Sequence, residues 1–146
     1  MKKILSIIML VAAFTIASTS VKAKSYSGAS AIPTFNQICN SENVESLFKN
    51  RGFKITKKRE YSEKYEETIT YITATYSSGN VSCKFVEDLY GFKITITGAA
   101  SVLDKFLSDA KAWINSQKRK NPDDPWIQRM FAEKSGNTIR VFFGGD

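Results

Sequence analysis

The most restrictive feature of this 146-residue sequence is a series of short alternating segments separated by short connections. Residues 53–60, 67–76, 81–85 and 92–97 each alternate apolar and polar side chains, which is the period of a half-buried β-strand. The connections between them are too short for the crossover that parallel strands require. The sequence therefore predicts an antiparallel meander, and residues 138–143 add a fifth strand with the same alternation.

The second of these segments changes phase halfway along. Ile69 and Tyr71 fall on one face, whereas Ile72, Ala74 and Tyr76 fall on the other. A one-residue change of register is what a β-bulge produces. We therefore predict a bulge in this strand.

Helical signals precede the strands. Thr34 and Gln37 form a capping box in front of a short helix. A change of apolar face near Asn40 ends that helix, and Ser41 is the predicted N-cap of the next one. Gly52 is predicted to end this second helix in the left-handed conformation.

Two further helices are predicted after the fourth strand. Apolar residues at helical spacing follow a capping-box-like start at Ser101, and this long helix ends before Pro122. Asp124 then caps a shorter helix that has Pro125 at its first position. Gly136 is the predicted end of that helix.

The predicted order of elements is α-β-β-β-β-α-α-β. Consecutive strands with helices before and after them are typical of class α+β, here an antiparallel sheet of about five strands covered by helices. The chain has the length of a single domain around one core once its N-terminal segment is removed.

This N-terminal segment has the features of a cleaved secretory signal peptide. Lys2 and Lys3 precede an apolar run of about fourteen residues, which is short for a membrane-spanning helix and suits a signal. Val21 and Ala23 supply the small residues of a cleavage site. Residues 1–23 are therefore predicted to be removed, and an uncleaved anchor is the alternative.

Export would place the mature chain in the periplasm or outside the cell, and the start of the chain resembles a bacterial export signal. Removal of three lysines with the signal lowers the formal net charge from +7 to +4. We predict a flexible leader at 24–32 and a single α+β domain at 33–146. No second apolar run is long enough to span a membrane.

The chain contains two cysteines, Cys39 and Cys83. An even number of cysteines in an exported chain favours a disulfide. This bond would connect the first helix to the sheet. The alternative is a pair of buried free thiols that pack as small hydrophobic groups.

The sequence contains no histidine. This excludes serine–histidine and cysteine–histidine nucleophile systems and zinc sites built on imidazole. Glycine-rich phosphate-binding motifs are also absent, and two cysteines alone do not make a structural zinc site. We therefore assign no catalytic residue, no metal ligand and no cofactor.

Carboxylates are the remaining candidates for catalysis. Asp123 and Asp124 lie between two prolines, and we interpret them as residues that stabilise the start of a helix. The acidic residues of the first hairpin are interpreted as a solvated loop. A small hydrolase with two facing carboxylates stays open as an alternative, because one sequence does not show which acids lie close together.

Two basic clusters are candidate binding residues. The first lies at the end of the first strand, where charge also protects an exposed sheet edge. The second lies at the end of the long helix, where cations also favour the helix dipole. Nucleic-acid binding is disfavoured by export and by the modest net charge. The clusters are Lys57, Lys58 and Arg59, and Lys118, Arg119 and Lys120.

Two aromatic residues, Tyr71 and Phe142, are predicted to point away from the apolar face of their strands. Aromatic side chains on the outer face of a sheet are typical of protein-binding surfaces, although a second helix can also cover them. The sequence as a whole favours an exported, non-enzymatic binding or inhibitor module. Its partner would be a protein or an anionic polysaccharide, and a structural protein of the cell envelope is a further alternative.

Overall fold

A six-stranded antiparallel sheet forms the centre of the structure, a computed structural model that describes residues 26–144. The predicted signal peptide and its cleavage site lie outside the described residues. The strand order is β1-β2-β3-β4-β6-β5, so the sheet is a meander up to β4, followed by a hairpin whose second strand pairs with β4. The strands are β1 (Lys54–Ser62), β2 (Glu67–Ser78), β3 (Val81–Asp88), β4 (Gly91–Thr97), β5 (Phe131–Ser135) and β6 (Thr138–Gly144).

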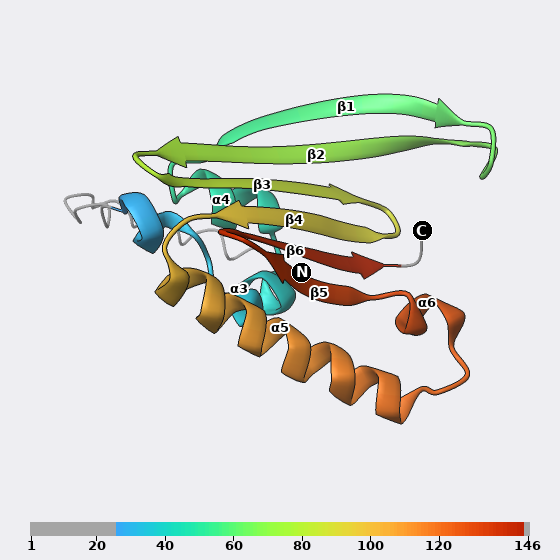
Figure 1. Ribbon diagram of the computed structural model, residues 1–146. Helices are drawn as coiled ribbons and strands as arrows, with labels where there is room; N and C mark the ends of the chain where they lie inside the picture. The colour runs from blue at the N-terminus through green and yellow to red at the C-terminus, as the bar shows by residue number, and fades with distance from the viewer. Residues whose placement is uncertain (1–25, 145–146) are drawn as a thin grey trace, which may run out of the picture.

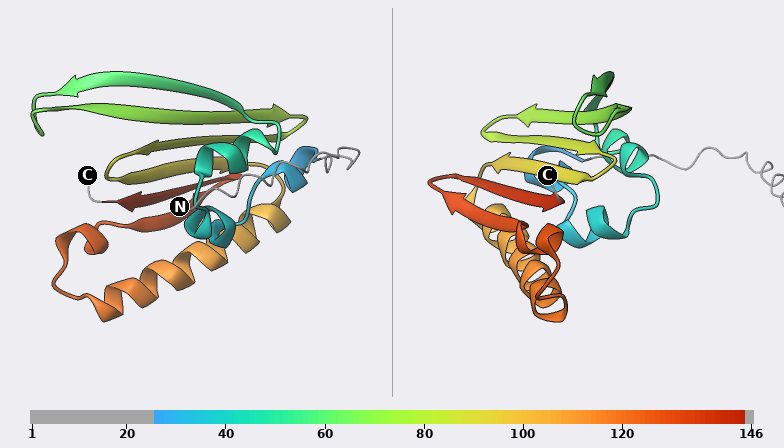
Figure 2. Two further views of the ribbon diagram at one scale, coloured as in Figure 1. Left: turned by 180° about the vertical axis from the view of Figure 1, so that it is seen from behind. Right: turned by 90° about the vertical axis from the view of Figure 1, so that its right-hand side faces the viewer.

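The helices lie against one face of this sheet (Figure 1). Helix α4 packs on β1 and β2, whereas α5 packs on β5 and β6 and also contacts α3. Figure 2 shows this layer of helices on one side of the sheet, with no described helix on the other side. The helices are η1 (Gly28–Ala31), α3 (Phe35–Asn40), α4 (Val44–Lys49), α5 (Ala100–Lys120) and α6 (Pro125–Gln128). This is the predicted α+β class, with six strands in the sheet.

Aromatic side chains form the centre of the core between the two layers. Phe35 of α3 is fully buried, and its ring lies 5.9 Å from the Phe106 ring of α5 and 6.4 Å from the Phe92 ring of β4. Phe92 in turn stacks on Phe143 of β6 at 4.8 Å. The inward-facing residues of β3, β4 and β6 follow the predicted alternation: Val81, Cys83, Phe85, Phe92, Ile94, Ile96, Ile139 and Val141 are all buried.

The caps of the short helices confirm one prediction and correct another. Thr34 and Gln37 form the predicted capping box at the start of α3. The N-cap of α4 is Asn43, whose side chain accepts a hydrogen bond from the Ser46 amide at 2.9 Å, so the prediction of Ser41 is wrong. Asparagine is among the strongest N-cap residues. Because Asn43 lies two residues after Ser41, α4 is shorter than predicted.

The end of α4 is as predicted. Gly52 has a φ of 87°, and the Phe53 amide donates to the Phe48 carbonyl at 3.1 Å. The rings of Phe48 and Phe53 lie 4.8 Å apart. These contacts form a Schellman motif, which directs the chain from α4 into β1.

The long helix ends as predicted but begins differently. Helix α5 stops at Lys120, two residues before Pro122. Its N-cap is Ala99, which has no side-chain hydrogen bond, so the predicted cap at Ser101 is not formed. Asp124 does cap α6, because its Oδ1 accepts from the Trp126 amide at 2.9 Å.

The sheet has a strand that the sequence analysis assigned to a helix. Helix α6 ends at Gln128, and β5 then pairs with β6 through a two-residue turn at Gly136 and Asn137. Gly136 has a φ of 60°, which a glycine at the first position of such a hairpin turn provides. Gly136 therefore connects two strands and does not end a helix.

The predicted bulge in β2 is also absent. The pairing of β2 with β1 is continuous from Lys54–Thr75 to Ser62–Glu67. Residues 67–71 pair with β1 alone, because β3 begins its pairing at Ile72. Ile69 and Tyr71 therefore lie on the face opposite Ala74, and Ile69 is buried there, outside the main core cluster.

The segment 24–32, predicted to be a flexible leader, contributes to the fold in its second half. Residues 28–31 form η1, and Ala31 and Ile32 are buried in the core. The Gly28 amide donates to the Tyr76 hydroxyl of β2 at 2.8 Å. These contacts attach the segment to the sheet.

Candidate functional site

The sheet face opposite the helices is the main candidate site, and we call it the open face. Its side chains come from alternate positions of each strand, so they follow from the same periodicity that defines the core. The register places them in rows across the strands. One row contains Thr75, Lys84, Thr95, Arg140 and Glu133, and the next contains Thr73, Val86, Lys93, Phe142 and Phe131.

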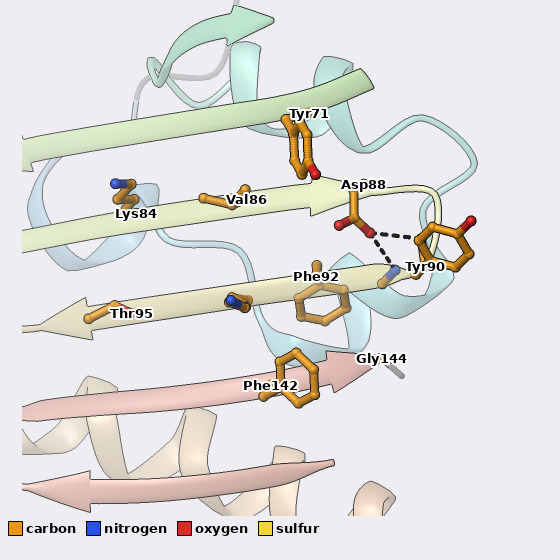
Figure 3. Close-up of a pocket in the computed structure, with 11 residues that line it drawn as sticks. Tyr71, Lys84, Val86, Asp88, Tyr90, Phe92, Thr95, Phe142 and Gly144 are labelled. Carbon is orange, nitrogen blue, oxygen red and sulfur yellow. Dashed lines mark hydrogen bonds between the residues drawn. The ribbon is translucent and has the colours of Figure 1, made fainter. Parts of the chain in front are cut away.

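A shallow pocket of about 480 Å³ lies on the open face (Figure 3). Tyr71 of β2 and Phe142 of β6 stand on opposite sides of it, with β3 and β4 between them. Lys84, Val86, Lys93 and Thr95 are among the other residues that line it. The pocket therefore has aromatic rings on two sides and cations and a hydroxyl between them.

Lys84 and Lys93 are the exposed cations of the pocket. Among the described residues, neither lysine has an ion-pair partner within 4.0 Å. The Lys93 ammonium lies 5.8 Å from the centre of the Phe142 ring, within cation–π distance. Phe142 also stacks on Phe131 at 5.9 Å, so its ring is supported from one side.

The carboxylate of the pocket, Asp88, stabilises a turn. Its Oδ1 atom accepts from the backbone amides of Tyr90 and Gly91 at 2.7 and 3.1 Å. Arg140 and Glu133, also on the open face, form an ion pair with each other. With two lysines and one aspartate in its lining, the pocket has an excess of positive charge.

The structure brings the two predicted aromatic residues to one site. Tyr71 and Phe142 are on the outer face, as their strand positions predict, and both line the pocket. No described helix covers them, so the alternative of a second helix over this face does not apply to residues 26–144. Lys84 and Lys93 were not among the predicted site residues, although each alternates with buried residues in 81–85 and 92–97 and this alternation places both on the open face.

The structure does not bring the two basic clusters together. Lys57, Lys58 and Arg59 lie on β1, at one edge of the sheet. Lys57 pairs with Glu45 of α4 at 2.7 Å, and Lys58 pairs with Glu60, whose hydrogen bond raises the pKa of the lysine. Both pairs are exposed, so each contributes little to stability.

The second basic cluster lies on the other side of the molecule. Lys118, Arg119 and Lys120 form the last turn of α5, which packs on the β5 and β6 side of the sheet. Their position agrees with the interpretation that these cations interact favourably with the dipole at the C-terminal end of the helix. Neither cluster lines the pocket of the open face.

The predicted disulfide is not present in the structure. Cys39 and Cys83 are free, which is the alternative considered for them. Cys83 is a core residue, and Cys39 packs against the same core from α3. Burial raises the pKa of Cys39 to about 11 and that of Cys83 to about 12, so both are neutral thiols at pH 7 and behave as small hydrophobic groups.

The carboxylates of the first hairpin have structural contacts. Glu67 accepts a hydrogen bond from the Tyr90 hydroxyl at 2.7 Å, which raises the pKa of the phenol to about 12. The Tyr90 ring lies 4.3 Å from Tyr65 and 5.8 Å from Trp126, so these contacts connect the β1–β2 and β3–β4 turns with α6. Glu60 is paired with Lys58, and the sequence's other hairpin acids, Glu63 and Glu66, lie in the turn.

Metal binding has no candidate site in the part of the chain that the structure describes. Residues 26–144 contain no group of three or more carboxylate or thiol side chains that could hold a metal ion. Asp124 caps α6, as its position beside the prolines predicts. Within the same residues, no helix combines the length and the apolar character needed to cross a bilayer.

Comparison with known proteins finds no match for this chain: no family model, no curated protein and no solved structure is significantly similar to it.

Proposed function

We propose that this protein is an exported, non-enzymatic binding module that holds its partner on the open face of its sheet. The observation that carries this proposal is the uncovered face itself, where Tyr71 and Phe142 border a pocket with two unpaired lysines. Helices cover the opposite face, so the open face is the broad sheet surface available for a partner. Export is part of the proposal and rests on the signal-like residues 1–23.

Binding fits the pocket better than hydrolysis does. Hydrolysis by carboxylates requires two acids with distinct roles on either side of the bond that breaks. The pocket contains one carboxylate, Asp88, and two backbone amides already donate to its Oδ1 atom. Lysines and aromatic rings, in contrast, supply charge and contact area for recognition.

A capture experiment tests the proposal. The mature chain from Lys24 onward is immobilised and exposed to cell-envelope and culture-medium extracts of its source at moderate salt. We expect one macromolecule to be retained in stoichiometric amount, and we expect Tyr71→Ala/Phe142→Ala to lose most of it. Circular dichroism and thermal unfolding check that the variant is folded.

Two variants of the basic clusters are the controls for the aromatic variant. Lys118→Glu/Lys120→Glu alters the second basic cluster, and Lys57→Glu alters the first on the covered face of β1, away from Tyr71; both should retain the partner. Loss of binding in a basic-cluster variant with normal binding by the aromatic variant would move the site to that cluster. If no macromolecule is retained by any form, the proposal of a binding module is wrong.

A further inference from the structure

We infer that the open face binds an anionic polysaccharide that carries carboxylate groups, with the polymer lying across the strands from Tyr71 to Phe142. This inference depends on the proposed function and names the ligand of the same site. Lys84 and Lys93 bind the carboxylates, and the two aromatic rings pack against sugar rings at either side of the pocket.

Charge is the first argument for an anionic ligand. The cations in the middle of the face, Lys84 and Lys93, have no acidic partner among the described residues, whereas the acids of the face are engaged. Glu133 pairs with Arg140, and Asp88 accepts two backbone hydrogen bonds. An incoming carboxylate therefore meets two ammonium groups that need not break an existing ion pair.

The spacing of the lysines is the second argument. Lys84 lies opposite Thr95, and Lys93 lies opposite Val86, so the lysines are diagonal neighbours on adjacent strands. Diagonal neighbours lie about 7–8 Å apart, with the Cβ atoms somewhat closer, and long side chains reach across this distance. Two flexible ammonium groups at this separation suit a ligand that presents acidic groups at intervals along a chain.

The composition of the face favours a polysaccharide over a protein. The buried centres of protein interfaces are depleted in lysine and rich in packed apolar groups. Here two lysines and Thr95 line the pocket together with Val86, and Tyr71 and Phe142 are separated by β3 and β4 (Figure 3). A sugar chain suits this pattern, because its hydroxyls bond to Thr95 and the Tyr71 hydroxyl while its C–H faces pack on aromatic rings.

Direct binding to defined polymers tests the inference. The probes are polygalacturonate, alginate and hyaluronan, with fully methyl-esterified polygalacturonate as the uncharged match for the first. Binding is measured by calorimetry or affinity electrophoresis on the mature chain. We expect binding to at least one carboxylated polymer, weaker binding as salt increases and no measurable binding to the methyl ester.

The variants assign the interaction to named side chains. Lys84→Gln/Lys93→Gln should weaken binding by about tenfold or more, the effect of one or two charge-assisted contacts. Phe142→Ala should weaken it by a similar factor. Lys49→Gln/Lys111→Gln removes the same charge from exposed helical positions outside the pocket and should change the affinity less than about twofold.

The possible results separate this inference from the proposed function. Failure of all three carboxylated polymers, together with retention of a protein that depends on Tyr71 and Phe142, would overturn the polysaccharide and leave the binding module in place. Equal losses in the two lysine variants would show non-specific attraction and would also overturn it. Absence of any ligand that depends on the open face would overturn both.

Discussion

The two faces of the sheet are built from alternate residues of the same strands, yet they differ in almost every property. The covered face of β4 carries Phe92, Ile94 and Ile96, all buried, and its open face carries Lys93 and Thr95, both exposed. Side-chain contacts on the covered face continue from the sheet into η1, α3, α4 and α5. On the open face, side-chain contacts are few and local, such as the Phe142–Phe131 stack.

This difference shows that the covered face supports stability, whereas the open face is free to carry a function. Changes on the covered face should therefore reduce the free energy of unfolding. Changes on the open face should leave it nearly unaltered and act on binding. The following predictions test that division.

The largest effect is expected for a matched pair of phenylalanines. Phe35→Ala removes a fully buried ring that contacts four other aromatic rings, so the loss of stability should be about 3–5 kcal/mol. Phe142→Ala removes a half-buried ring of the open face and should lower stability by about 1 kcal/mol or less. Urea unfolding of both variants measures the two values, and similar losses would contradict the division between the faces.

Gly91 should be an exception on the open face. A Cβ atom at this position would lie 2.1 Å from the Phe143 carbonyl oxygen and 2.5 Å from the Gly144 Cα, because β4 and β6 approach closely there. Gly91→Ala should therefore lower stability by about 2 kcal/mol or more.

Gly79→Ala is the control for Gly91. Gly79 has a φ of 59°, but a Cβ added there would have no neighbouring atom within 4 Å, so only backbone strain of about 1 kcal/mol applies. Thermal unfolding gives the order of the two variants. A smaller loss for Gly91→Ala than for Gly79→Ala would show that the close approach of β4 and β6 is not rigid.

The smallest effect concerns a charge on the covered face. Burial, and then the neighbouring charge of Asp88, raise the pKa of Glu87 above its ordinary value. Because the pKa of Glu87 is raised in the folded protein, its protonated form favours folding. This contribution to stability is complete below the pKa of the unfolded chain and is lost as the pH rises through the pKa of the folded protein.

Glu87→Gln should therefore stabilise the protein at pH 7, by less than about 1 kcal/mol because the side chain is only half buried. The difference should disappear below about pH 4, where both forms are neutral. Denaturant titrations at the two pH values measure this change. An equal stability of Glu87→Gln and the unaltered protein at pH 7 would contradict the role of burial.

Local signals in the sequence predicted much of the fold. The Thr34–Gln37 capping box, the Gly52 helix end and the Asp124 cap each depend on a few adjacent residues. The alternation in β3, β4 and β6 correctly separated buried from outer positions. Strand position in β2 and β6 also placed Tyr71 and Phe142 on the open face, and the alternation in β3 and β4 contained the information needed to place Lys84 and Lys93 on the same face.

The errors arose where local patterns depend on distant partners. Gly79-Asn80 and Gly136-Asn137 are the same dipeptide, and both connect antiparallel strands. Only the first lay between two clearly alternating segments, so the second was interpreted as the end of a helix. The change of phase in β2 likewise reflects the burial of Ile69 on the face opposite Ala74, which residues 67–76 alone do not encode.

The position of β6 in the sheet has a consequence for how the chain reaches this structure. It is the last strand of the described chain, yet it lies between β4 and β5, and its Thr138 contacts Thr97 of β4 from 41 positions away. During synthesis, β4 therefore has an unpaired edge and its aromatic face lacks part of its cover until the final hairpin is made. Folding must follow synthesis of that hairpin, and any delay prolongs the time in which the β4 edge is available for aggregation.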